Sequence, residues 1–287
     1  WIKITTAVGS APCMWFDTGN NHLMSMPGVP HEMKRMMIDH VLPRLRKKYT
    51  LPVIYHKVIR TIGQGESFLA EKIAGWENAL PEHMKLAYLP SLGEVKLRLT
   101  CFGTSLDALM AEAEAQTEKL KDRIGQFIYA YGETSIEVAI GDLLRSNTLT
   151  LSIAESCTGG YVSHLITSVP GSSEYFQGSI VPYSYDIKMS QLGIQEDTLN
   201  QYGAVSEQTI IEMATMVRKK FNTSIGVATS GIAGPGGATA EKQVGTVWIA
   251  YADERGVKTK KLQLSKERHL NIELASKAVL NLIRLSV

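Results

Sequence analysis

The chain has 287 residues, of which 44% are hydrophobic and 20% charged, and its formal net charge at pH 7 is +2. These values are typical of a globular protein of two or three domains, and a charge near zero gives no strong signal for nucleic-acid binding. Every apolar run is far shorter than the roughly 20 residues that a membrane-spanning helix needs. The three cysteines form no CxxC pair, which argues against a disulfide framework or a thiolate metal site. With no secretory signal visible, we expect a cytoplasmic protein that contacts no membrane.

Residues 1–50 have the pattern of the last part of a domain. The expected elements are a strand (1–6), a turn (9–12), a second strand (22–26) and a helix (31–45) that opens after a Pro-Gly-Val-Pro turn. One helix and two short strands make a poor core by themselves. Because the chain also opens at Trp1 inside a predicted strand, we expect it to be a piece of a longer protein.

Residues 51–132 are predicted to form a small α+β domain. Its expected elements are a strand (53–62), a helix (66–78), two strands (85–89 and 96–102), a helix (105–124) and a strand (127–131). The order βαββαβ is that of a split-βαβ sandwich. No catalytic cluster is visible here.

Residues 133–287 alternate between strands and helices, which predicts a layered α/β domain with helices on both faces of the sheet. The expected helices are 135–145, 158–168, a short one containing Lys188, 206–221 and 268–285, and the expected strands are 149–155, 178–183, 224–230, 246–252 and 258–264.

The most informative stretch is residues 154–160, with the sequence AESCTGG, between a predicted strand and a predicted helix. Its backbone N–H groups at a helix N-terminus could hold an anion or a developing oxyanion. The hydroxyls of Ser156 and Thr158 would lie at the C-terminal edge of the sheet, where open α/β sheets bind ligands. Ser156 could equally be only the N-cap of the helix, and the stretch alone does not decide between these readings.

Three loops of small, hydroxylated or glycine residues follow this pattern: 156–160, 171–173 and 229–237. If they converge at one edge of the sheet, they make a pocket rich in backbone donors and suited to a phosphorylated small molecule. The Gly-rich loop alone is weak evidence, because it lacks the ending of a P-loop and the spacing of a dinucleotide fingerprint. An ordinary surface turn is the alternative.

Ser156 and Lys188 are the candidate catalytic pair. A serine needs a base to become a nucleophile, and the histidines of this domain, His164 and His269, do not neighbour a Gly-rich loop. A lysine can be that base where burial lowers its pKa; the alternative is that Lys188 is an ordinary surface lysine. Metal-dependent hydrolysis is disfavoured, since no HxxxH, HExxH or paired-Asp motif occurs in this domain.

Five ordered motifs in this domain resemble the CinA C-terminal family, which is the nicotinamide mononucleotide (NMN) deamidase family. They are AESCTGG (154–160), PGSS (170–173), GAVSE (203–207), SGIAGPGG (230–237) and VGTVW (244–248). Upstream, GSAP (9–12) and MPGVP (26–30) are similar to the end of the molybdopterin-binding-like domain of that family, and the βαββαβ region is similar to its KH-like domain. The resemblance covers essentially the whole chain and implies domains at 1–50, 51–132 and 133–287.

The resemblance implies hydrolysis of the NMN carboxamide to nicotinic acid mononucleotide and ammonia, in pyridine nucleotide recycling. Ser156 would be the nucleophile and Lys188 its general base, with no cofactor. A divalent metal would serve only the pyrophosphatase activity of the N-terminal domain, most of which is absent here. The positions that match the family's substrate contacts are Thr158, Gly159, Ser173, Tyr183, Ser230, Gly231 and Arg268.

The sequence departs from the family pattern at Pro182, Tyr185, Ser230 and Gln243, where Thr, Asn, Thr and Pro are usual. Two other functions stay open: a non-catalytic nucleotide-binding module in competence or the DNA-damage response, and an auxiliary part of an ADP-ribose pyrophosphatase. The resemblance also implies a homodimer.

Overall fold

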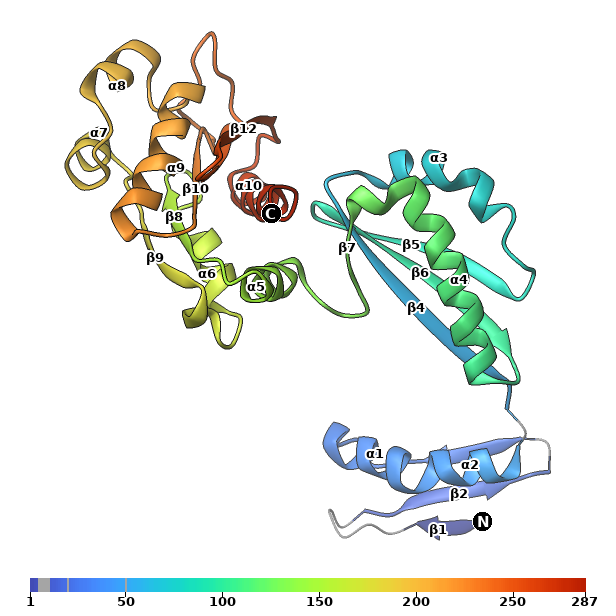
Figure 1. The fold of residues 1–287 in the computed structure, drawn as a ribbon. Coiled ribbons are helices and arrows are strands. Elements are labelled where there is room, and N and C mark those ends of the chain that lie inside the picture. The colour runs from blue at the N-terminus through green and yellow to red at the C-terminus, as the bar shows by residue number, and fades with distance from the viewer. Residues whose placement is uncertain (5–10, 20, 50) are drawn as a thin grey trace. The chain divides into compact units, whose positions relative to one another are not determined.

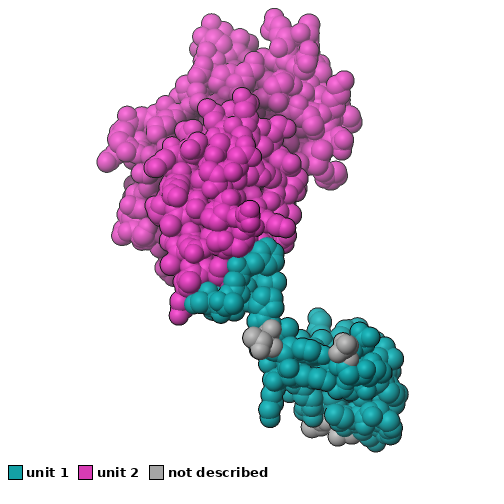
Figure 2. Space-filling model, turned by 90° about the vertical axis from the view of Figure 1, so that its right-hand side faces the viewer, with its two compact units in different colours: residues 1–54, 102–106 teal, residues 55–101, 107–287 magenta. Residues whose placement is uncertain are grey.

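The computed structural model describes residues 1–4, 11–19, 21–49 and 51–287. The chain divides into two compact units, which are residues 1–54 with 102–106 and residues 55–101 with 107–287 (Figure 2). A compact unit can hold more than one domain, so the domain boundaries after residues 50 and 132 stay predictions.

The first unit contains a small antiparallel sheet in the order β1-β2-β3, formed by β1 (Ile2–Ile4), β2 (Cys13–Asp17) and β3 (His22–Ser25). The predicted strand at 22–26 is confirmed, whereas β2 was not predicted. In β2, Cys13 and Trp15 alternate into the core with Ile4. The predicted turn at 9–12 and the end of the predicted strand at 1–6 fall partly outside the described residues.

The predicted helix at 31–45 is present, but it is interrupted and runs further. It consists of α1 (Pro30–Met36), the π-helix η1 (Met37–Val41) and α2 (Leu42–Lys48). Pro43 lies in the first turn of α2. A proline inside a helix lacks an N–H and clashes with the carbonyl four residues back, and a wider π-turn before it relieves both problems.

The α+β region that follows has the predicted βαββαβ order (Figure 1). Its elements are β4 (Val53–Ile62), α3 (Glu66–Glu77), β5 (Met84–Ser91), β6 (Glu94–Gly103), α4 (Leu106–Ile124), the 3-10 turn η2 (Gly125–Phe127) and β7 (Ile128–Tyr131). The four strands form a sheet in the order β5-β6-β4-β7. Alternate residues of β6, such as Val95, Leu97 and Leu99, are buried, as expected for a sheet with one covered face.

The last region contains a five-stranded sheet in the order β12-β11-β10-β8-β9. Strands β8 (Leu151–Glu155), β9 (Phe176–Ile180) and β10 (Ile225–Gly231) are parallel, and β11 (Thr246–Asp253) and β12 (Gly256–Gln263) continue the sheet in antiparallel order. The helices are α5 (Ile136–Ser146), α6 (Tyr161–Thr167), α7 (Tyr185–Ile187), α8 (Glu196–Tyr202), α9 (Glu207–Phe221) and α10 (Arg268–Arg284), with the 3-10 turn η3 (Ser172–Glu174) and the π-helix η4 (Lys188–Leu192).

Helices cover both faces of this sheet, which confirms the predicted three-layer α/β architecture (Figure 1). On one face, Leu151 and Ile153 of β8 pack with side chains of α5, α6 and α10. On the other, the smaller Ala154 and Ala228 pack with α9 and the segment around η4. The small side chains let α9 lie close to the strands, since a Cβ on Gly226 would come within 2.3 Å of the Ala214 carbonyl.

Three elements of this region differ from the prediction. The strand expected at 178–183 is β9, which ends at Ile180 because Pro182 cannot donate to a ladder. The helix expected at 158–168 begins only at Tyr161, and α8 was not predicted. Among the helices in the described part of the chain, none combines the length and apolarity needed to cross a membrane.

Candidate active site

A cavity of about 200 Å³ lies at the carboxyl edge of the five-stranded sheet. The three parallel strands all end here, so the segments that follow them meet at one place. Its lining residues come from the turn after β8, the segment after β9, the loop between α8 and α9, the end of β10 and the first turn of α10: Ser156, Cys157, Tyr183, Lys188, Ala204, Val205, Ser230, Gly231, Ala233 and Arg268.

Lys188 points its amine at Ser156 inside this cavity. Its Nζ lies 3.1 Å from Ser156 Oγ, 2.6 Å from the Pro182 carbonyl oxygen and 3.4 Å from the Tyr183 carbonyl oxygen. Lys188 is the first residue of η4 and directly follows the short helix α7, which Ser184 caps by accepting a hydrogen bond from the Ile187 N–H. Only 1% of Lys188 is exposed, so the alternative of an ordinary surface lysine is wrong.

The surroundings of Lys188 favour its neutral form. Among the described residues no carboxylate forms an ion pair with it, and burial lowers the pKa of Lys188 to about 8. A neutral amine has two protons and one lone pair. With its protons donated to the carbonyls of Pro182 and Tyr183, its lone pair faces Ser156 Oγ and can accept the hydroxyl proton.

Ser156 is not the N-cap of the helix, so the interpretation of Ser156 as only a helix cap is wrong. The N-cap of α6 is Gly160, whose φ of 100° favours glycine. The N–H groups of Gly160, Val162 and Ser163 donate to the carboxylate of Glu155 at 2.8–3.0 Å. The expected anion site at this helix end is therefore occupied by the chain's own side chain.

The turn between Ser156 and α6 still offers two backbone donors. The Ser156 N–H donates to the Thr229 carbonyl, and the Gly159 N–H donates to the Ser156 carbonyl. By contrast, the N–H groups of Cys157 and Thr158 donate to no other residue in the described part of the chain. They directly follow Ser156 and are the candidate donors to an oxyanion formed at its Oγ.

Cys157 also lines the cavity, but its thiol is a poor nucleophile. Burial raises the pKa of Cys157 to about 12, and a thiol reacts as its thiolate. Ser156 lies beside a lysine that loses its proton near pH 8, whereas the Cys157 thiol keeps its own proton at that pH.

Four of the predicted substrate contacts line the cavity. Arg268 donates to the Gly234 carbonyl and to the Tyr183 hydroxyl, both at 2.9 Å, while Tyr183 itself is 59% exposed. Ser230 donates to the Ala204 carbonyl at 2.7 Å. Gly231 must be glycine because a Cβ there would lie 2.6 Å from a methyl group of Val247 on the neighbouring strand.

The structure does not bring Ser173 to this cavity. Ser173 lies on η3, which precedes β9, and the backbone next to it reaches the start of β8, where the Leu151 N–H donates to the Tyr175 carbonyl. A loop before a parallel strand lies at the amino edge of the sheet, opposite the cavity. The expectation that 171–173 joins the other two loops is therefore wrong, and 181–184, after β9, takes its place.

Thr158 and Gly159 do not line the cavity that contains Ser156 and Lys188. The Thr158 hydroxyl donates to Glu155 at 2.7 Å and lies 2.6 Å from the Thr229 hydroxyl, so it points into the protein rather than to a ligand. Both residues line a separate hollow of about 490 Å³ with His164, His269 and Glu273. Because its hydroxyl is used within the protein, the backbone N–H is the group of Thr158 that is left to contact a substrate in the cavity.

The departures from the family pattern leave the Ser156–Lys188 contact in place. Lys188 uses the backbone carbonyl of Pro182, which any residue type supplies. Tyr185 accepts a hydrogen bond from the Ala204 N–H and lines a neighbouring hollow of about 600 Å³. Gln243 is exposed, and its carbonyl accepts from the Thr246 N–H.

Two buried polar residues of this site were not predicted. Glu155 is fully buried and accepts hydrogen bonds from Thr158 and from the first residues of α6. Asn271 is buried on α10 and donates to the carbonyls of Ala233 and Ser265, both at 2.9 Å, which ties the Gly-rich loop to the helix that carries Arg268. Among the described residues, no group of three or more His, Cys, Asp or Glu side chains could hold a metal ion.

Comparison with known proteins identifies the family. Residues 133–287 match the family model for the CinA C-terminal domain, and residues 56–130 match that for the damage-inducible protein CinA KH domain. A CinA-like protein of Cytophaga hutchinsonii is 50% identical over 281 residues, covering 98% of this chain and 67% of that protein. A CinA-like protein of Amoebophilus asiaticus is 47% identical, covering 98% of this chain and 68% of that protein.

A solved structure agrees with this. The crystal structure of a competence or damage-inducible protein from Enterobacter asburiae superposes with a TM-score of 0.51 at 32% identity, covering 54% of this chain and 100% of that chain. The fold and the site together define a three-layer α/β domain with a serine–lysine pair at its carboxyl edge. The chain belongs to the CinA family, and it spans about two thirds of the length of the two relatives.

Proposed function

We propose that the protein is an amidohydrolase that converts NMN to nicotinic acid mononucleotide and ammonia, in pyridine nucleotide recycling. The observation that carries the proposal is the 3.1 Å contact, inside a cavity, between a serine hydroxyl and a buried lysine amine that forms no ion pair with any described carboxylate. Family membership supports the choice of NMN among amides. The geometry supports acyl transfer as the reaction class.

In the first step, neutral Lys188 accepts the hydroxyl proton of Ser156 while Oγ attacks the carboxamide carbon. The carbonyl oxygen becomes an oxyanion that the N–H groups of Cys157 and Thr158 can stabilise. Protonated Lys188 then donates its proton to the nitrogen of the leaving group, which departs as ammonia. Donation to the Pro182 and Tyr183 carbonyls keeps the amine directed at the reacting atoms throughout.

In the second step, water attacks the ester that Ser156 has formed. Lys188 accepts a proton from this water and returns it to Ser156 Oγ as the ester bond breaks, which gives the carboxylic acid, the free serine and the neutral lysine. No proton acceptor other than Lys188 is needed in either half of the reaction. This chemistry uses no cofactor, and the absence of a metal requirement is part of the proposal.

Arg268 and Tyr183 are proposed to hold the substrate. Arg268 is a cation at the mouth of the cavity, and its guanidinium suits a phosphate. Ser230 and Gly231 would contact the substrate from the end of β10. A contact from Ser173 would have to come from a second copy of the chain, in the homodimer that we also propose.

Ammonia release from NMN in the presence of a chelator tests the proposal. We expect turnover by the wild type and a loss of about 1,000-fold or more in both Ser156→Ala and Lys188→Ala, because each removes one half of a unit that acts together. A folded wild type that releases no ammonia would overturn the amidase proposal and favour the non-catalytic module. Turnover of ADP-ribose by a longer protein but not by this chain would favour the auxiliary role.

A further inference from the structure

Glu155 is a fully buried carboxylate beside the proposed nucleophile that the reaction scheme does not use. It is the last residue of β8, directly before Ser156. Oε2 accepts from the Thr158 hydroxyl at 2.7 Å and from the N–H groups of Gly160 and Val162, both at 3.0 Å. Oε1 accepts from the N–H and the hydroxyl of Ser163, at 2.8 and 2.6 Å.

These five hydrogen bonds fix the turn on which the site is built. Their donors lie on both sides of Gly159 and Gly160, two residues with positive φ that would otherwise allow the turn several conformations. The carboxylate thus joins the end of β8 to the first turn of α6 across the flexible glycines. The short segment between these anchors carries Ser156 and the N–H groups of Cys157 and Thr158, which donate to no other residue in the described part of the chain.

A second strand completes this arrangement. A carboxylate can only accept hydrogen bonds, so the Thr158 hydroxyl donates to Glu155 and the Thr229 hydroxyl must donate to Thr158, across 2.6 Å. The Thr229 carbonyl in turn accepts from the Ser156 N–H at 2.9 Å. The direction of both hydrogen bonds is therefore fixed: Thr229 of β10 donates to Thr158, and Thr158 donates to Glu155.

In the described part of the chain, Glu155 forms no hydrogen bond with the reacting groups themselves. Its five partners all lie in the turn and in α6, and neither Ser156 Oγ nor Lys188 Nζ is among them. A proton-transfer role is thereby disfavoured. The carboxylate also fills the helix end where a substrate anion would otherwise bind.

We propose that Glu155 is a positioning residue for the acyl-transfer site, which holds Ser156 and the oxyanion donors of Cys157 and Thr158 in register with Lys188. This inference rests on the proposed amidase function. It predicts that loss of the carboxylate impairs transition-state stabilisation more than substrate binding, because the oxyanion exists only during the reaction.

The test compares Glu155→Gln with Glu212→Gln. Glutamine keeps the size of the side chain but replaces one acceptor oxygen with a donor, which leaves an N–H of the turn unpaired. Glu212 is the matched control, because its carboxylate accepts from the Gln195 N–H and the Thr198 hydroxyl at the start of α8, outside the cavity.

For Glu155→Gln we expect kcat on NMN to fall about 10- to 100-fold with KM changed less than about threefold. The rising, acidic limb of the pH profile should not move, because Lys188 is untouched. Glu212→Gln should lower the melting temperature without changing kcat. An unchanged kcat in folded Glu155→Gln, or an equal loss of kcat in both variants, would overturn the inference.

Two further measurements cover the other outcomes. If Glu155→Gln does not fold, Ser163→Ala removes one of the five donors, and we expect kcat to fall about threefold; an unchanged kcat in this folded variant counts against the inference. If the wild type does not turn over NMN, the amidase proposal fails, and labelling with phenylmethanesulfonyl fluoride decides the role of Glu155 alone.

In that labelling, Ser156 Oγ forms a bond to sulfur, fluoride leaves and Lys188 accepts the proton. The mass of the intact protein, measured over time, gives the rate of this labelling. We expect labelling about tenfold slower in Glu155→Gln than in the wild type, because negative charge also develops on the sulfonyl oxygens. Equal rates in the two proteins, or no labelling of Ser156 in the wild type, would contradict the proposed positioning of the serine.

Discussion

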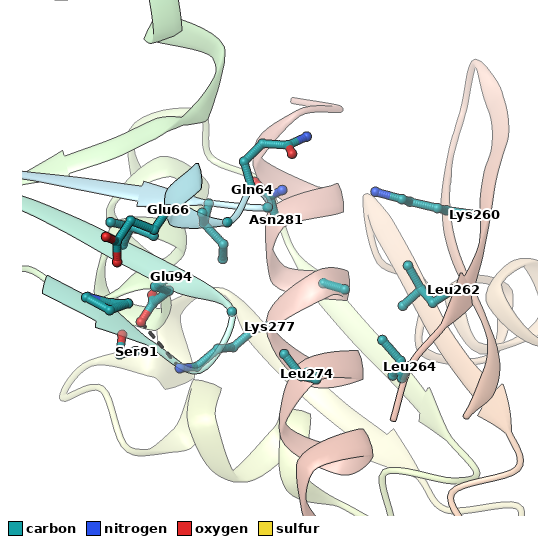
Figure 3. Close-up of a pocket in the computed structure, with 17 residues that line it drawn as sticks. Gln64, Glu66, Ser91, Glu94, Lys260, Leu262, Leu264, Leu274, Lys277 and Asn281 are labelled. Atoms are coloured by element: carbon teal, nitrogen blue, oxygen red, sulfur yellow. Dashed lines mark hydrogen bonds and ion pairs between the residues drawn. The ribbon is translucent and has the colours of Figure 1, made fainter. Parts of the chain in front are cut away.

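The cavity around Lys188 and the cavity around Lys277 each contain a largely buried lysine amine, but of the two only Lys277 forms ion pairs with carboxylates among the described residues. Lys277 lies 3.3 Å from both Glu94 and Glu273 and donates to the Leu92 carbonyl at 2.8 Å. It lines a cavity of about 380 Å³ with apolar side chains of β12 and α10, such as Leu262 and Leu274 (Figure 3).

Lys188, by contrast, has a serine hydroxyl and two carbonyls as its neighbours. A buried ammonium without a counter-charge is unfavourable, and the group responds by losing its proton more readily. The ion pair of Lys277 joins the β5–β6 hairpin to α10, whereas Lys188, which has no ion pair among the described residues, is the base of the proposed reaction. The difference between a structural and a reactive lysine here lies in the partners rather than in burial alone.

Replacing each of the two lysines is expected to have its largest effect on the free energy of unfolding. The fall in the pKa of Lys188 from 10.5 to about 8 corresponds to a penalty of about 3 kcal/mol for burying the ammonium at pH 7. Lys188→Met should therefore raise the free energy of unfolding by about 1–2 kcal/mol, after the lost hydrogen bonds are counted. Lys277→Met should lower it by about 1–2 kcal/mol, because Glu94 loses a partner.

Urea unfolding at pH 7 and at pH 10.5 measures both variants. The unfolded chain binds the Lys188 proton up to about pH 10.5, while the folded chain releases it near pH 8. The penalty is thus fully present below pH 8 and disappears as pH rises to 10.5, so the advantage of Lys188→Met over the wild type should shrink over that range. A destabilised Lys188→Met at pH 7 would contradict this account of the lysine.

A smaller effect is expected at the mouth of the cavity. Tyr183→Phe removes the hydroxyl that accepts from Arg268 at 2.9 Å. Since both side chains are exposed, we expect kcat/KM on NMN to fall about two- to fivefold, mainly through KM. Tyr202→Phe, on the neighbouring hollow, is the control and should behave like the wild type; an equal loss in both would argue against a specific role of Tyr183.

Much of the fold followed from the sequence, because its periodic segments are long. The βαββαβ order and the alternation of strands and helices after residue 133 were predicted, and so was the closing helix that carries Arg268. The short elements β2 and α8 were missed. In β2 only two residues, Cys13 and Trp15, alternate into the core, which is too few for a period to be read.

The site was predicted unevenly for a related reason. The motif around Ser156 and the position of Lys188 gave the pair, but loop 171–173, which precedes β9, does not converge with the loops that follow β8 and β10. Glu155 gave no usable signal. A capping glutamate is expected three residues after the N-cap, whereas Glu155 lies five residues before the N-cap Gly160, and only the folded turn brings it to the helix end.

The pH dependence of kcat/KM for NMN tests the central claim most directly, because it reports the base that activates Ser156 in the free enzyme. Lys188 must be neutral to accept the serine proton. In the presence of chelator, kcat/KM should therefore rise about tenfold per pH unit at acidic pH and level off above a limb at about 8. A profile that is flat between pH 6 and 10, or that retains its limb in Lys188→Ala, would contradict a serine–lysine amidohydrolase.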